Sequence, residues 1–182
     1  ETIKAAMLMR DSHIVKPILV GRMNKIMDKV ESMGADYDLS GIEIVNAAVN
    51  PNIDKYIEHL YARLKRNGYL HRDCARMVKT DRNIFAASMV AHNDADGMVT
   101  GLTKNYTTCL DDTLKVIDPS EDNVVFSYSI LIARKHNIII ADSSVNETLT
   151  AKQMANIAMQ AANIVRSMGE EAPRVAFISS TN

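Results

Sequence analysis

Apolar residues recur along the chain with helical and strand-like spacing. From Met23 to Met33 they fall on one helical face, and Gly34 supplies a favoured helix end. A second helix starts at Pro51 and stops at Gly68. The pattern predicts further helices up to about 11 and at 71–79, 82–92, 107–117 and 150–165, and strands at 17–21, 42–45, 97–101 and 174–179.

The pattern changes after Asp118 and Pro119. Two apolar runs, 124–133 and 138–141, are separated only by the turn-like segment 134–137, which predicts an antiparallel hairpin. We therefore expect two subdomains, 1–118 and 119–182.

Strands that alternate with helices predict an α/β fold, a three-layer α/β/α arrangement whose mostly parallel sheet is covered on both faces. Ligands of such folds gather beyond the carboxyl ends of the strands. The segments to search are therefore Asn46, Gly101 to Thr108, Asp142 to Asn146 and Ser179 to Asn182.

Composition excludes several classes of function. The chain has 182 residues, of which 47% are hydrophobic, and its net charge of -1 gives no basic field that would attract nucleic acid or an acidic membrane. No apolar run approaches the roughly 18 residues that a membrane span needs. The two cysteines suggest no disulfide framework, so we expect a cytoplasmic protein. The apolar patterns at residues 3–7 and 174–178 lead us to expect that both ends are cut.

The segment after the predicted strand 97–101 is the main candidate anion site. Its hydroxyls, its ammonium group and its backbone N–H groups suit a phosphate or coenzyme A. An ordinary polar loop, capped by Thr107 or Thr108, remains the alternative. The candidate residues here are Thr100, Gly101, Thr103, Lys104, Asn105 and Thr107.

Other polar segments predict less. Asn93 to Gly97 lacks the ligand spacing of a calcium loop and is interpreted as a turn. The five histidines stand singly, so no metal site is predicted. Further candidate ligand contacts follow later strands: Asp142, Ser143, Asn146, Ser179, Ser180 and Thr181.

Five segments together resemble the phosphate acetyl/butyryltransferase family, in particular the variant fused behind bacterial NADP-dependent malic enzymes. They are Pro17–Arg22, Ile42–Asn46, Asp81–Ala87, Asp94–Tyr106 and Thr150–Ala158. The resemblance implies a fold like that of isocitrate and isopropylmalate dehydrogenases, with a cleft between two subdomains, and a dimer or larger homo-oligomer.

The resemblance also identifies departures. Active members transfer acetyl between acetyl phosphate and coenzyme A, and they place an arginine where this chain has Asp111. At about 4 Å, that replacement would change the interaction with a phosphate by roughly 2 to 8 kcal/mol. Arg63 and Arg66 lie near the position of another phosphate-binding arginine, and the family's late Ser-Arg and Asp group lies beyond Asn182.

The resemblance therefore implies a regulatory and oligomerisation domain that senses acetyl-CoA. Its partner would be a malic enzyme catalytic domain that converts malate to pyruvate with NADP and a divalent metal, all bound outside this chain. An active phosphate acetyltransferase is the alternative, and a purely structural dimerisation domain is a third.

Overall fold

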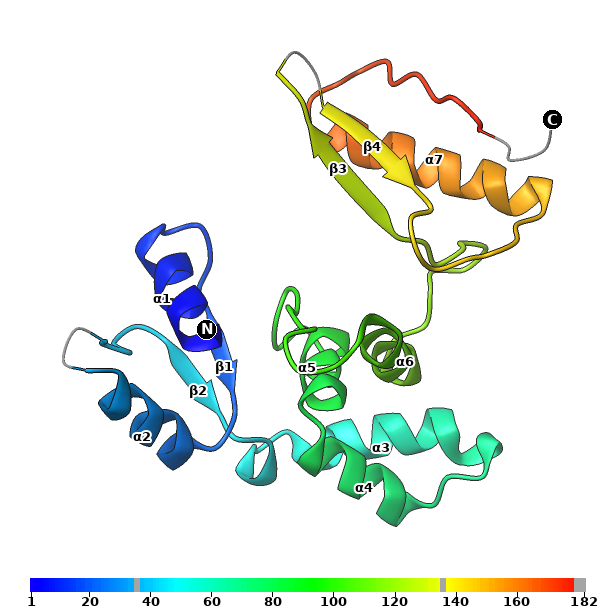
Figure 1. Cartoon of the computed structure of the whole chain (residues 1–182). Coiled ribbons are helices and arrows are strands. Elements are labelled where there is room, and N and C mark those ends of the chain that lie inside the picture. Colours follow the sequence, from blue (N-terminus) through cyan, green and yellow to red (C-terminus); the bar gives the residue numbers. More distant parts are fainter. Residues whose placement is uncertain (35–36, 135–136, 179–182) are drawn as a thin grey trace. The chain divides into compact units, whose positions relative to one another are not determined.

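The computed structural model describes residues 1–34, 37–134 and 137–178, which form two compact units, Glu1–Asp118 and Pro119–Asn182. Unit 1 contains α1 to α6 with β1 and β2, and unit 2 contains β3, β4 and α7 (Figure 1).

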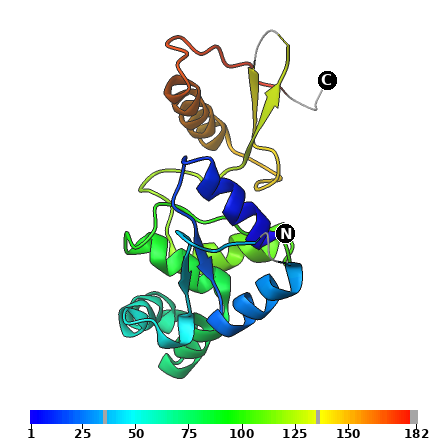
Figure 2. The same cartoon turned by 90° about the vertical axis from the view of Figure 1, so that its left-hand side faces the viewer.

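The first part of unit 1 is a small parallel sheet with two helices. β1 (Ile18–Val20) pairs with β2 (Glu43–Val45), and α1 (Thr2–Asp11) and α2 (Met23–Met33) precede and follow β1 in the chain (Figure 2). Ala6 of α1 and Leu19 of β1 are buried together, and Ile26 of α2 packs against them. The predicted helices and strands of this part are confirmed.

The rest of unit 1 is helical and holds the main core. The helices are α3 (Ile53–Leu64), α4 (His71–Thr80), α5 (Arg82–Ala91) and α6 (Tyr106–Val116), with 3₁₀ turns at Ala47–Val49 and Lys65–Asn67. Tyr56 and Leu60 of α3, Val78 of α4, Phe85 of α5 and Val116 of α6 are almost completely buried. The rings of Tyr56 and Phe85 pack edge to face, with 5.5 Å between their centroids, which is a favourable geometry.

Unit 2 is a hairpin beside one long helix. β3 (Tyr128–Ile132) and β4 (Asn137–Ala141) pair in antiparallel fashion, as predicted. α7 (Ala151–Ser167) begins with the predicted capping box, in which Thr150 and Gln153 bond to each other's backbone N–H groups. Ile157 and Ala162 are the buried apolar residues of the described part of this unit.

Two predicted strands are wrong. Residues 97–101 have no regular secondary structure, and Val99 is 93% exposed. Residues 174–178 also form no strand, and Ile178 is 90% exposed. An apolar run becomes a strand only beside a strand that can share its hydrogen bonds, and no described strand pairs with either segment. The described strands form two two-stranded sheets, so the fold is mixed α/β, and the three-layer arrangement with its cleft stays a prediction.

Candidate ligand-binding site

The loop between α5 and α6 is held by its own lysine. The ammonium of Lys104 lies 2.7 Å from Asp81 Oδ2 and 2.7 Å from Asp112 Oδ2. Asp81 also caps α5, because its Oδ1 accepts hydrogen bonds from the backbone N–H groups of Asn83 and Ile84. Lys104 therefore joins the start of α5 to the middle of α6.

Asp112 is the centre of this network. Its side chain is 6% exposed, and it also accepts hydrogen bonds from Asn83 Nδ2 and Lys115 Nζ, both at 3.2 Å. Burial favours the neutral acid, but the hydrogen bonds from Lys104 and Lys115 outweigh it and lower the pKa of Asp112. Desolvation would lower the pKa of Lys104, but its hydrogen bonds to Asp112 and Asp81 raise it. The charge of Lys104 is thus already balanced inside the protein.

The remaining loop candidates are exposed. Thr100 donates its hydroxyl to Asn83 Oδ1 at 2.7 Å, which ties the start of the loop to the network. Asn105, rather than Thr107 or Thr108, is the N-cap of α6, because its Oδ1 accepts the N–H of Thr108. Gly101 has a φ of +112°, a conformation that a residue with a Cβ rarely adopts.

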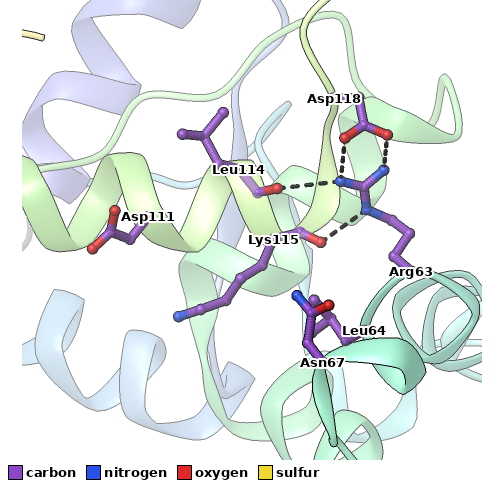
Figure 3. Close-up of a pocket in the computed structure, with 7 residues that line it drawn as sticks. All are labelled: Arg63, Leu64, Asn67, Asp111, Leu114, Lys115 and Asp118. Carbon is purple, nitrogen blue, oxygen red and sulfur yellow. Dashed lines mark hydrogen bonds and ion pairs between the residues drawn. The ribbon is translucent and has the colours of Figure 1, made fainter. Parts of the chain in front are cut away.

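An open groove of about 630 Å³ lies between α3 and the C-terminal half of α6 (Figure 3). Arg63 of α3 forms part of its wall. The Nη1 and Nη2 atoms of Arg63 donate to the two carboxylate oxygens of Asp118, and its Nε donates to the carbonyl of Lys115 at 2.9 Å. The groove is lined by Arg63, Leu64, Asn67, Asp111, Leu114, Lys115 and Asp118.

α3 thereby caps the end of α6. Arg63 also donates to the carbonyl of Leu114 at 3.2 Å, and His59 Nε2 lies 3.0 Å from the carbonyl of Val116. These carbonyls have no partner within the helix, so side-chain donors satisfy them. The hydrogen bonds with Asp118 raise the pKa of Arg63, and those from Arg63 lower the pKa of Asp118. Arg66 lies in the 3₁₀ turn after α3 and is exposed, apart from this arrangement.

The candidates of unit 2 surround one carboxylate. Asp142 accepts hydrogen bonds from the backbone N–H groups of Ser127, Ser144, Val145 and Asn146. The Ser127 hydroxyl and the Asn146 side-chain amide, each 2.6 Å away, donate to it as well. Burial would raise the pKa of Asp142, but these donors lower it far below the ordinary range. Its carboxylate already fills the concave set of N–H groups that an anion would otherwise use.

The structure brings some candidates together and not others. Thr100, Lys104 and Asn105 share the loop of unit 1, whereas Ser143 lies beside Ser127 in unit 2, with 2.9 Å between their hydroxyls. Ser179, Ser180 and Thr181 lie outside the described residues. Sequence reasoning missed the hydrogen-bonding partners Asp112, Asp118 and Ser127, since contacts between separate elements leave no local pattern.

Two kinds of site find no support within residues 1–34, 37–134 and 137–178. No group of three or more histidine, cysteine or acidic side chains is arranged to hold a metal ion there. No helix in these ranges combines the length and the apolar composition that a membrane span requires.

The chain belongs to the Phosphate acetyl/butaryl transferase family, whose model matches residues 1–182. The family resemblance seen in the sequence is thus confirmed.

Individual relatives carry two kinds of name. The chain is 48% identical to the Probable NADP-dependent malic enzyme of Rickettsia prowazekii and 41% identical to the NADP-dependent malic enzyme of Rhizobium meliloti, in each case over 98% of this chain and 23% of the relative. It is 29% identical to the Phosphate acetyltransferase of Nitratidesulfovibrio vulgaris, over 97% of this chain and 25% of the relative. The chain therefore spans about a quarter of the length of these relatives.

A solved structure has the same fold. The EutD phosphotransacetylase from Staphylococcus aureus superimposes with a TM-score of 0.79 at 22% sequence identity, covering 91% of this chain and 49% of that chain. At this identity the likeness concerns the fold alone.

Proposed function

We propose that this chain is a phosphotransacetylase-like regulatory and oligomerisation domain of an NADP-dependent malic enzyme, and that it senses acetyl-CoA. The two relatives at 48% and 41% identity carry that enzyme name and support this context. The malate, NADP and metal sites would then lie in the catalytic domain, outside this chain. The three-layer fold with a cleft between two subdomains belongs to the same proposal.

One observation supports a regulatory role over a catalytic one. Two of the three candidate cations, Lys104 and Arg63, are paired with carboxylates of the protein itself. A transferase must stabilise negative charge on a transferring group with preorganised donors, and donors that are already paired supply little of that stabilisation. A sensor needs only to bind its effector more tightly in one global state of the enzyme than in another.

The test uses the full-length polypeptide that contains this chain. Acetyl-CoA is expected to bind, as measured by calorimetry, and to change the rate of malate oxidation. Thr103→Val removes an exposed hydroxyl of the loop and is expected to weaken binding, while Thr148→Val removes an exposed hydroxyl of unit 2 and serves as the control. If acetyl-CoA neither binds nor changes the rate, the chain has a structural role in the oligomer instead.

An active phosphate acetyltransferase remains the second candidate, because the relative at 29% identity bears that name. Under this alternative, the full-length polypeptide would form acetyl-CoA from acetyl phosphate and coenzyme A, and the activity would fall on substitution of Lys104 or Asn105. The absence of any turnover would leave the regulatory proposal alone.

A further inference from the structure

Four of the five N–H groups of the Arg63 guanidinium donate to acceptors within the protein. Both carboxylate oxygens of Asp118 bind it, and the carbonyls of Leu114 and Lys115 take further N–H groups. The planar fork of an arginine matches a carboxylate and a phosphate equally well. Asp118 therefore occupies the position that an oxyanion ligand would take at Arg63.

The charges of the groove point the same way. Its wall contains two cations, Arg63 and Lys115, and two anions, Asp111 and Asp118. Lys115 also forms an ion pair with the buried Asp112. The four groove charges cancel, so a phosphate would enter without any surplus positive charge to attract it. It would also have to displace Asp118, whose side chain is 72% exposed and therefore free to move aside.

We propose that Asp118 is the specificity-determining residue of this groove, an internal counter-ion that excludes oxyanions from Arg63. Asp111 would repel an anion too. It lies one helical turn before Lys115, the residue whose carbonyl binds Arg63, and so about 6 Å from Lys115 along the axis of α6. A charge in direct contact acts far more strongly than one at that distance through water. Asp118 should therefore outweigh Asp111. This inference rests on the proposed function in one respect: it takes the domain to be regulatory, so that the groove holds no phosphate substrate.

The experiment uses calorimetry to measure the binding of inorganic phosphate to the full-length polypeptide that contains this chain. Asp118→Asn keeps the shape of the side chain and removes its charge, and it is expected to bind phosphate about tenfold or more tightly than the unsubstituted protein. Asp111→Asn should give a smaller gain. Asp96→Asn is the matched control, because it makes the same change of net charge at an exposed residue outside the groove.

A further variant separates the arginine fork from simple charge. Adding Arg63→Lys to Asp118→Asn keeps the positive charge but removes the bidentate geometry, and it is expected to abolish most of the gain. The contact of His59 with the carbonyl of Val116 does not depend on Arg63, and circular dichroism checks whether the loss of the Arg63 donors to Leu114 and Lys115 affects the fold. The proposal is overturned if Asp118→Asn binds no more tightly than Asp96→Asn, or if the gain survives without Arg63. Loss of acetyl-CoA sensing alone would leave these results unchanged.

Discussion

Unit 1 and unit 2 are built by different means. Unit 1 buries aromatic and aliphatic side chains from four helices, including Tyr56 and Phe85, and its buried Asp112 is matched by charged partners. In the described part of unit 2, only Ile157 and Ala162 are buried among the apolar residues, and most of the hairpin side chains are exposed.

Local polar contacts shape unit 2 instead of a core. The turn after β4 is organised around Asp142, and α7 is fixed by its capping box and by Asn156, which accepts the N–H of Val124 at 2.9 Å. Hydrogen bonds of this kind define geometry but contribute modest net stability, whereas burial supplies most of the driving force. Unit 1 should therefore contribute most of the free energy of unfolding.

The largest expected effect tests that statement with one pair of matched substitutions. Phe85→Ala empties a fully buried site of unit 1 and should lower the free energy of unfolding by about 3 to 5 kcal/mol. Phe177→Ala in unit 2 removes a ring that is 63% exposed and should change it by less than about 0.5 kcal/mol. Urea unfolding of the two variants measures both values, and equal losses would contradict the comparison.

Next in size is the charge network of unit 1. Asp112→Ala leaves Lys104 and Asn83 without their shared acceptor and should cost about 1 to 3 kcal/mol, while Asp111→Ala next to it should be nearly neutral. Because the folded-state pKa of Asp112 is lowered, its contribution is complete above the ordinary value of 3.8 and is lost as the pH falls through the folded-state value. Urea unfolding between pH 3 and 7 should show a weaker pH dependence in Asp112→Ala than in the unsubstituted protein, since Asp118 and Asp142, whose pKa values are also lowered, still contribute.

A smaller effect is expected at the helix cap of unit 2. Thr150→Ala removes the side chain that caps α7 and should destabilise the start of that helix by about 1 kcal/mol. Hydrogen exchange of the first-turn amides of α7 reports this local change directly. Thr148→Ala, two residues earlier and exposed, is the control, and similar exchange in both variants would argue against the cap.

The smallest effect at neutral pH concerns a tyrosine of unit 1. Burial raises the pKa of Tyr56 to about 12, and its hydrogen bond to Asp94 acts in the same direction. Since the folded-state pKa exceeds the ordinary value of 10, the resulting stability is present below pH 10 and is lost as the pH rises toward 12. Absorbance titration should show one phenol ionising near pH 12 that disappears in Tyr56→Phe.

Most of the secondary structure could be predicted because local signals determine it. Gly34 and Gly68 end helices, Asp81 and Thr150 begin them, and the spacing of apolar residues identifies the helix faces. The predictions of a strand at 97–101 and over the described residues 174–178 are wrong, because strand formation depends on a neighbouring strand, which an apolar run cannot reveal.

The candidate site was predicted in part. Lys104 and Asn105 were identified from their loop, and their role as ligand contacts stays a prediction. The carboxylates that bind Lys104 and Arg63 were not predicted. The contact of Lys104 with Asp81 joins residues 23 positions apart, and that of Arg63 with Asp118 joins residues 55 positions apart. Such pairs follow from how helices pack, and a single sequence carries no local pattern for them.

The pairing of Arg63 with Asp118 also has a genetic consequence. Asp118 neutralises the charge of Arg63 in the folded protein. Every aspartate codon becomes an asparagine codon through one change of its first base, so a single mutation at position 118 would remove the counter-ion of Arg63. The anion binding proposed for Asp118→Asn would therefore lie one nucleotide away, and it would require no change in α3 or α6.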